Sequence, residues 1–182
     1  MRYFWPRAES RIYHEAKRLV ESGLATASEG YVGKRRRTTY AITDDGRKAL
    51  ETWLSSTAGT WFSLESEGLL RLFLADVGSK EDIVAALEGM REEAIDMLLV
   101  GRGVADEYLA GNSPQQDIVH IRALVFDFLA QFGLGVIDWA ERSLAEVEHW
   151  DDLSPDGKAE RALDVIEQRV ANYPAPESRP VG

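Results

Sequence analysis

The stretch that decides the fold is residues 33–43, which run GKRRRTTYAIT. A glycine followed by four cations favours an exposed turn over residues 33–36, and the alternation from Thr39 to Ile42 is typical of a strand over 37–43. Upstream, residues 24–31 have a composition compatible with a strand. Together these segments predict a β-hairpin.

Helices are predicted on both sides of this hairpin. The first ends at Gly23 and carries one apolar face, which consists of Ile12, Ala16, Leu19 and Val20. The second begins after Thr43, a plausible N-cap, and one of its faces carries Gly46, Leu50, Trp53 and Leu54. The predicted order is helix, hairpin, helix, with Tyr40 and Trp53 in the core.

Charge is divided unevenly along the chain. Residues 1–50 hold 11 Lys and Arg against 6 Asp and Glu, whereas the other 132 residues hold 10 against 25. A basic segment is attracted to phosphates by counterion release, and an acidic remainder keeps a protein soluble and away from non-specific polyanions. The overall charge of -10 therefore does not exclude a nucleic-acid partner.

Two long helices are predicted in the second half of the chain. The first begins at Ser79 with a capping box to Asp82, and its apolar residues recur at alternating steps of four and three. After a break at residues 111–114, the second begins near Ile118 with the same rhythm. We expect the two helices to pack antiparallel.

Shorter segments connect and follow these two helices. Residues 57–63 are a linker candidate, and the apolar residues of 69–74 predict a buried helix between the domains. A last helix is predicted after Ser154-Pro155, with Ala162, Val165, Ile166 and Val170 on one face. From Pro174 onward we expect a disordered tail.

The cellular compartment can be predicted from what the sequence lacks. The chain has no cysteine, which excludes disulfides and thiolate-rich zinc sites. It has no uninterrupted apolar run approaching the roughly 20 residues that span a bilayer, and no secretory signal follows Met1. We therefore expect a cytoplasmic protein without a membrane partner.

The order and spacing of the first motifs resemble those of the PadR family of bacterial transcriptional regulators. The resemblance rests on five motifs: Trp5-Pro6, Ile12-Tyr13, Gly23-Leu24, the basic wing at 33–37, and the Tyr-x-Ile-Thr-x-x-Gly sequence from Tyr40 to Gly46. Residues 69–150 are similar, through weaker motifs, to the helical dimerisation domain of that family. The resemblance implies a winged helix-turn-helix regulator whose helical dimer admits aromatic or hydrophobic effectors.

The first predicted helix would act as the recognition helix. Its polar and basic side chains lie opposite its apolar face and can enter a major groove, and Arg11 is the first candidate for base contacts. The wing suits phosphates or the adjacent minor groove, although a solvated turn is the alternative for this charge run. For Tyr13, packing on the hairpin and contact with a phosphate both stay open. The candidate DNA-binding residues are Ser10, Arg11, Tyr13, His14, Lys17, Arg18, Lys34, Arg35, Arg36 and Arg37.

The chain departs from the PadR pattern at its beginning. The family places two helices before the recognition helix, and they are absent here, so large apolar residues such as Leu19 would each lose burial worth about 1.5–3 kcal/mol. We hypothesise that Met1 is an internal start and that residues 2–5 belong to a loop after a lost helix. An in-frame stop codon immediately before Met1 would contradict this hypothesis.

Other candidate sites carry weaker signals. Asp117 with His120, and Glu146 with His149, have the spacing used in di-iron bundles, but the pairs lie 29 residues apart on one predicted helix. We therefore expect no metal and no cofactor. No arrangement of serine, histidine and acid predicts an enzyme.

Glycines and aromatic residues of the long helices have structural interpretations as well. Glycines within the helical patterns predict close helix packing rather than nucleotide binding; they are Gly101, Gly103, Gly133 and Gly135. Aromatic residues at helical spacing are usually core, but four of them could line an effector pocket: Trp61, Phe128, Phe132 and Trp139.

The predicted fold class is mainly α with a small β-hairpin. We expect an N-terminally incomplete winged helix-turn-helix domain over 1–58, an α-helical antiparallel dimerisation domain over 59–173 and a tail over 174–182. The predicted function is a sequence-specific, effector-responsive repressor that acts as a homodimer on a palindromic operator. The alternative is a helical homodimeric interaction protein that has lost DNA binding.

Overall fold

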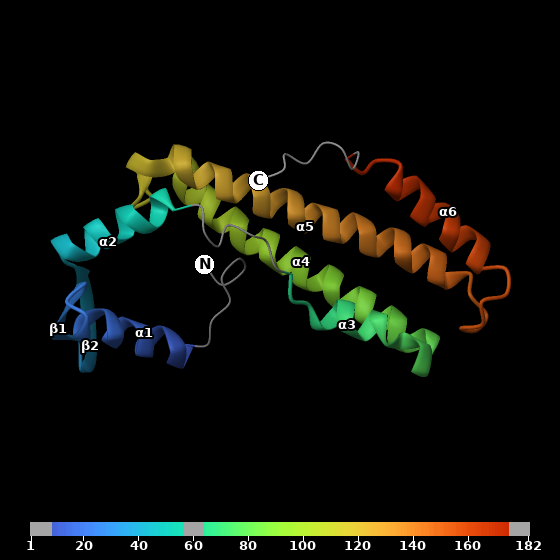
Figure 1. Cartoon of the computed structure of the whole chain (residues 1–182), viewed down its shortest axis with the longest axis horizontal. Helices are drawn as coiled ribbons and strands as arrows, with labels where there is room; N and C mark the ends of the chain where they lie inside the picture. The colour runs from blue at the N-terminus through green and yellow to red at the C-terminus, as the bar shows by residue number, and fades with distance from the viewer. Residues whose placement is uncertain (1–8, 57–63, 175–182) are drawn as a thin grey trace. The chain divides into compact units, whose positions relative to one another are not determined.

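A computed structural model describes residues 9–56 and 64–174 of the chain, and side chains from residue 13 onward. These residues fall into two compact units, one within Met1–Leu64 and one within Glu65–Gly182. The N-terminal unit contains α1 (Glu9–Glu21), β1 (Ala25–Val32), β2 (Arg35–Ile42) and α2 (Asp44–Ser55). The C-terminal unit contains α3 (Glu67–Phe73), α4 (Lys80–Leu109), α5 (Val119–Glu148) and α6 (Ala159–Val170), with short 3₁₀ turns at Ala75–Val77 and Gln116–Ile118 (Figure 1). The mainly helical fold with one hairpin confirms the predicted fold class.

Helix α1 ends at Gly23, as predicted. Gly23 has a φ of 72°, and two hydrogen bonds close the helix end: the Leu24 N–H donates to the Leu19 carbonyl at 2.9 Å, and the Gly23 N–H donates to the Val20 carbonyl at 2.9 Å. This is a Schellman motif, which favours glycine because the residue must adopt a left-handed conformation. The chain therefore turns directly from α1 into β1.

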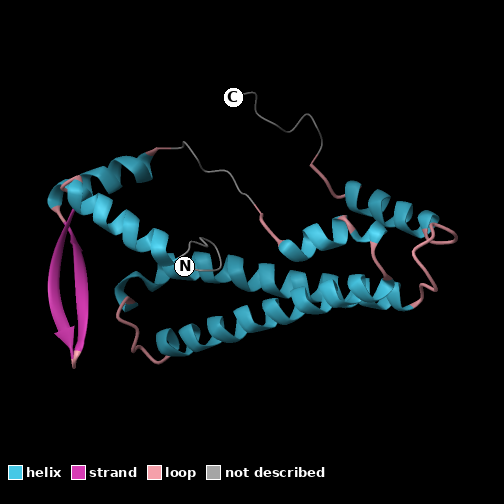
Figure 2. Cartoon of the chain, turned by 90° about the horizontal axis from the view of Figure 1, so that it is seen from below, coloured by secondary structure: helices cyan, strands magenta, loops and turns pink. Residues whose placement is uncertain are grey.

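The β-hairpin has a shorter turn than the sequence predicted. Antiparallel pairing continues to Val32 opposite Arg35, so only Gly33 and Lys34 form the loop (Figure 2). Gly33 has a φ of 62°, whereas Lys34 does not have a positive φ, which is the pattern of a two-residue type II′ turn. Because of this turn, Arg35 and Arg36 belong to the strand and alternate between its two faces.

Thr43 and Gly46 join α2 to the end of α1. The Thr43 hydroxyl accepts from the Gly46 N–H at 3.0 Å and donates to the Gly23 carbonyl at 2.8 Å, while the Thr43 N–H donates to the Leu24 carbonyl at 3.1 Å. Gly46 is buried, and a Cβ there would lie 2.1 Å from the Leu24 carbonyl oxygen. The Thr-x-x-Gly sequence is thus the N-cap of α2 together with a close backbone contact.

Helices α4 and α5 pack antiparallel as predicted, and they form the centre of the C-terminal unit (Figures 1 and 2). The capping box of α4 is present: the Ser79 hydroxyl accepts from the Asp82 N–H, and the Asp82 carboxylate accepts from the Ser79 N–H at 2.9 Å. The buried apolar residues among those described are Ile83, Leu87, Ala94, Met97, Ala140 and Val147. At the same end of the helix pair, the Lys80 ammonium donates to the Glu148 and Trp150 carbonyls and so caps the C-terminus of α5.

The helical glycines differ in how closely they pack. A Cβ at Gly133 would lie 2.7 Å from the Met97 methyl and 2.9 Å from Leu98, so the predicted close packing is confirmed there. At Gly101 the nearest atom, of Phe126, would be 3.8 Å away, which is ordinary contact. At Gly103 and Gly135 nothing lies within 4 Å, and the prediction is wrong because both face away from the α4–α5 seam.

Several side chains expected in the core are exposed in the single chain. Trp53 is 67% exposed, although Tyr40 is half-buried as expected. Helix α3 has no buried residue, and Phe73 is 83% exposed. Both expectations were based on apolar periodicity, which identifies a face that tends to be covered but not whether the same chain covers it.

One helical stretch, residues 116–148, is long and apolar enough to cross a membrane by length and composition alone. Its mean hydropathy reaches 1.4 over 18 residues, and 11% of that window is buried. The expectation of no such run was based on uninterrupted apolar residues, whereas this stretch includes charges. Asp127 lies in it, and an aspartate at the centre of a bilayer costs about 2.5–3.5 kcal/mol. An apolar helix that needs cover in water fits these observations equally well.

Candidate nucleic-acid interface

Helix α1 presents a polar face to solvent. His14, Lys17 and Arg18 are exposed, and Tyr13 is 64% exposed, whereas Ala16 and Val20 on the other side are half-buried. Ser10 and Arg11 lie in the first turn of α1, but their side chains lie outside the described part of the chain. Leu19, which also belongs to the predicted apolar face, is 47% exposed, so the predicted division of α1 into a packed face and an open face holds only in part.

The hairpin separates the basic run of the wing into two faces. Since side chains alternate along a strand, Arg35 and Arg37 share one face with Thr39, and Arg36 lies on the other face with Thr38 and Tyr40. Tyr40 and Ala25, on the same face as Arg36, are half-buried. The end of this hairpin face away from the turn therefore packs toward the helices. The open face of the wing therefore carries two of the four predicted cations.

Glu29 neutralises the third cation of the wing. Its carboxylate accepts a short hydrogen bond from the Arg36 guanidinium across the two strands, and both side chains stay mostly exposed. This hydrogen bond raises the pKa of Arg36 above its ordinary value. Glu29 is diagonal to Arg36 in the hairpin register, and the sequence analysis did not single it out.

We predict that Glu29→Gln strengthens DNA binding. The substitution removes a negative charge from the wing and releases Arg36 for a phosphate, so the dissociation constant for DNA should fall a few-fold. The slope of the logarithm of the binding constant against the logarithm of salt concentration should steepen by up to about 0.9. Mobility-shift titrations at several salt concentrations would measure both quantities. Glu51→Gln, which removes the same charge from α2, is the control and should leave binding unchanged. Equal affinity of Glu29→Gln and the unmodified chain would contradict this role of Glu29.

Hydroxyl groups on the open wing face were also missed. Ser28 lies opposite Thr39 on the face that carries Arg35 and Arg37, and its hydroxyl donates to the Thr39 carbonyl at 3.4 Å. A two-residue Gly-Lys turn fixes the register from the sequence, so these neighbours could have been found by counting outward from Gly33. They add hydrogen-bonding groups beside the two arginines.

The candidate effector residues are not brought together. Phe128 and Phe132 stack with ring centroids 6.4 Å apart and stay 52% and 38% exposed. Trp139 instead packs against the buried cluster of Ile83, Leu87 and Val147. Trp61 lies outside the described residues.

The two carboxylate–histidine pairs are also separate. Glu146 accepts from the Trp150 indole N–H at 3.1 Å and from Arg161 at 3.2 Å, and these contacts lower the pKa of its carboxyl, with the Trp150 hydrogen bond contributing most. Across the described ranges 9–56 and 64–174, no group of three or more His, Asp or Glu side chains converges as metal ligands would.

Comparison with known proteins shows similarity to bacterial transcriptional regulators. Residues 1–52 match the family model described as the transcriptional regulator PadR-like family. The chain is 23% identical over 150 residues to the negative transcriptional regulator PadR of Bacillus subtilis, covering 80% of this chain and 81% of that protein.

Solved structures of that Bacillus subtilis protein share the fold of this chain. The structure in complex with operator DNA has a TM-score of 0.60 and 21% identity, over 80% of this chain and 82% of that one. The structure in complex with p-coumaric acid has a TM-score of 0.58 and 21% identity, over 81% and 82%.

Proposed function

We propose that this chain, a PadR-family transcriptional regulator, works as a homodimeric repressor that binds a palindromic operator and is released by a small ligand. The observation that carries the proposal is the pairing of an open polar face on α1 with an open basic face on the adjacent wing. A helix presents side chains to base edges in the major groove, and a basic hairpin contacts the flanking backbone.

Each group of residues has a distinct role in this proposal. Side chains of α1 contact bases and nearby phosphates, with Arg11 as the principal base contact, and the wing holds the sugar-phosphate backbone. Within the wing, Arg35 and Arg37 make the stronger contacts because Arg36 is paired with Glu29. The full set is Ser10, Arg11, Tyr13, His14, Lys17, Arg18, Lys34, Arg35, Arg36 and Arg37.

The C-terminal unit would supply the two-fold symmetry. Helices α4 and α5 of two copies pair about a two-fold axis and place two recognition helices on successive half-sites, about 34 Å apart. The exposed apolar side chains of α5 support this role, because association with a second copy would remove them from water. Asp127 within α5 favours a protein partner over lipid and thus a cytoplasmic dimer.

The ligand would be a small aromatic or hydrophobic molecule. The Bacillus subtilis PadR has been solved with p-coumaric acid, which is a molecule of this class. Phe128, Phe132 and Trp139 remain the candidate contacts on α5, together with Trp61. A p-coumarate titration monitored by tryptophan fluorescence would test this part of the proposal.

We predict that Arg11→Ala and Arg37→Ala weaken DNA binding in different ways. Loss of a base contact should relax sequence preference, at a cost of about 1–3 kcal/mol on the preferred operator. Loss of a backbone contact should weaken binding to all duplexes alike and reduce the salt slope by about 0.9. Mobility shifts of both variants on the DNA upstream of the protein's own gene, and on a scrambled duplex, distinguish the two patterns.

The outcome at low salt decides between the two candidate functions. If the chain binds neither duplex at low ionic strength, while sedimentation still gives a dimer, the alternative of a helical interaction protein is supported and the repressor is excluded. Binding to the upstream DNA in preference to the scrambled duplex would support the repressor. The negative charge of the C-terminal part of the chain makes non-specific attraction a poor explanation for such a preference.

A further inference from the structure

Helix α6 carries an apolar seam that no described residue of its own chain covers. Leu163, Ile166 and Val170 follow one another at steps of three and four along α6, which is the a and d spacing of helices that pack side by side, and Tyr173 lies three residues after the last residue of the helix. These four side chains are 53–68% exposed, and α6 has no buried residue. The seam is therefore suited to another helix but is open to water.

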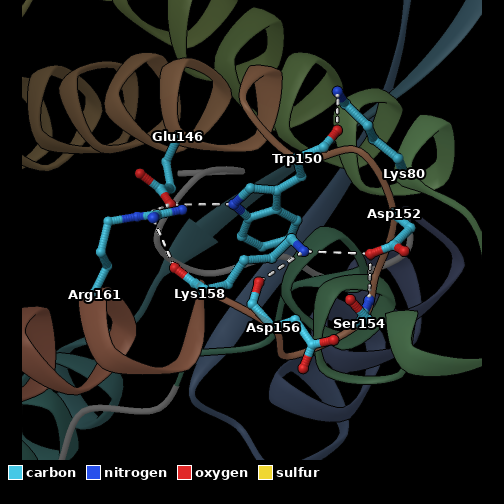
Figure 3. A network of polar contacts seen from close by, with 9 residues as sticks. Lys80, Glu146, Trp150, Asp152, Ser154, Asp156, Lys158 and Arg161 are labelled. Carbon is cyan, nitrogen blue, oxygen red and sulfur yellow. Dashed lines mark hydrogen bonds and ion pairs between the residues drawn. The ribbon is translucent and has the colours of Figure 1, made fainter.

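Polar contacts hold α6 at its first turn. Arg161 bonds Glu146 of α5 at 3.2 Å and the Gly157 carbonyl at 2.7 Å, and Lys158 bonds Asp152 at 3.3 Å (Figure 3). Behind these contacts lies an open groove of about 450 Å³, lined by Trp150 and Leu153 on one side and by Ala162 and Val165 of α6 on the other. Helix α6 is thus held to α5 at its first turn, and an open groove separates the two helices beyond it.

A second exposed surface lies further along α5. Five side chains form it: Ile121, Leu124, Val125, Phe128 and Phe132, which are 38–73% exposed. At 100° per residue they share one face, about 100° from the seam with α4, and Arg142 and Glu146 beneath α6 continue that face. We call residues 121–132 of this face the α5 stripe.

Helix α6 cannot cover the α5 stripe of its own chain. Helix α6 starts beside the C-terminal end of α5 and runs back along it (Figure 1). Its 12 residues span about 18 Å, the length of 12 residues of α5, so it ends before residue 132. The stripe is also 12 residues long. Helix α6 therefore matches it in length but can reach only the stripe of a neighbouring copy.

We propose that α6 is an exchanged dimerisation arm, whose seam packs on the α5 stripe of a second copy of this chain. The inference rests on the proposed homodimer and specifies how its two subunits interlock. A two-fold axis would make the contact twice, because every copy carries one seam and one stripe.

The exposed area is sufficient for a stable dimer. The stripe and the seam together offer nine large apolar side chains. At roughly 100 Å² each they amount to about 900 Å² per copy, above the approximately 800 Å² per partner of a standard interface. Neither surface reaches that area alone, which favours reciprocal exchange over a contact through α6 only.

Cross-linking provides the direct test, because the chain contains no cysteine. One copy carries Ile166→Cys and the other Leu124→Cys, with different affinity tags, and the doubly tagged complex is treated with a short bis-maleimide. We expect a covalent dimer that joins the two tags. Ala123→Cys replaces Leu124→Cys as the control, because Ala123 is exposed and points away from the stripe at 100° per residue, and it should give no such product.

A second measurement keeps the test independent of cross-linking chemistry. Ile166→Asp with Val170→Asp should weaken dimerisation at least tenfold in sedimentation experiments, while circular dichroism stays unchanged. Gln168→Asp, on the opposite face of α6, should leave the dimer as it is. A cross-link between two copies of Ile166→Cys without one to Leu124→Cys would overturn the exchange in favour of a contact between two arms.

The remaining outcomes separate this inference from the proposed function. If the chain stays dimeric with Ile166→Asp and Val170→Asp, and α6 does not cross-link to α5, the exchanged arm is wrong and the homodimeric regulator stands. A wild-type chain that is monomeric at micromolar concentration contradicts both. A monomer that floats with phosphatidylglycerol vesicles identifies lipid as the occupant of the stripe and likewise overturns the exchange.

Discussion

Gly46→Ala should unfold the N-terminal unit and abolish DNA binding while the C-terminal unit stays folded. The added Cβ would lie 2.1 Å from the Leu24 carbonyl oxygen and 2.8 Å from Ile42, and neither group can move without displacing the junction between α1 and the hairpin. Relief requires α2 to shift, which breaks the hydrogen bonds of Thr43 to Gly23 and to Gly46. We expect a loss of roughly 3 kcal/mol, the upper end for overpacking.

Amide hydrogen exchange of residues 9–56 would measure this loss, together with a mobility shift. Gly30→Ala is the matched control, because a Cβ there meets nothing within 4 Å; its unfolding free energy should change by less than about 0.5 kcal/mol. If Gly46→Ala kept the stability and the DNA affinity of the unmodified chain, the close contact would have no role in positioning the wing.

Leu87→Ala should produce the largest loss of stability in the C-terminal unit. Leu87 is 2% exposed and packs with Ile83 and Val147, surrounded by half-buried residues that include Trp139 and Trp150. Removing a buried leucine side chain costs roughly 2–5 kcal/mol, through lost burial and the cavity that remains. The melting temperature measured by circular dichroism should fall accordingly.

Leu109→Ala provides the comparison for that measurement. Leu109 is the last residue of α4 and is 85% exposed, so the same chemical change should alter the unfolding free energy by less than about 0.5 kcal/mol. Equal losses for the two variants would mean that the buried cluster does not hold α4 and α5 together.

The sequence predicted best those elements whose signals are local. Gly23 at the end of α1, the capping box of Ser79 and Asp82, and the break after α4 each depend on the few residues around them. The hairpin was also predicted, but its turn was placed two residues too long because four cations in a row suggested a loop. Pairing across strands overrode that composition and put Arg35 and Arg36 into β2.

Contacts between distant residues were harder to predict. Nothing near Arg36 in sequence indicates that Glu29 binds it, since the pair forms only once the register is fixed. Likewise, the apolar pattern identified the face of α2 that carries Trp53 but not whether this chain covers it. Among the candidate DNA-binding residues, helical periodicity predicted which side chains of α1 are exposed. It did not predict that Arg36 is paired with Glu29 while Arg35 and Arg37 lie on the open face of the wing.

The low burial of α5 also bears on how much of this protein a cell must make. In the proposed homodimer, a helix whose most apolar window is 11% buried in one copy would gain most of its cover when two copies meet. Folding and assembly would then share one equilibrium, so the melting temperature would rise with protein concentration. Below the concentration at which copies meet, open chains are exposed to proteases, and above it they are protected. Gene dosage would thus set a threshold for repression, and halving expression could remove more than half of the active regulator.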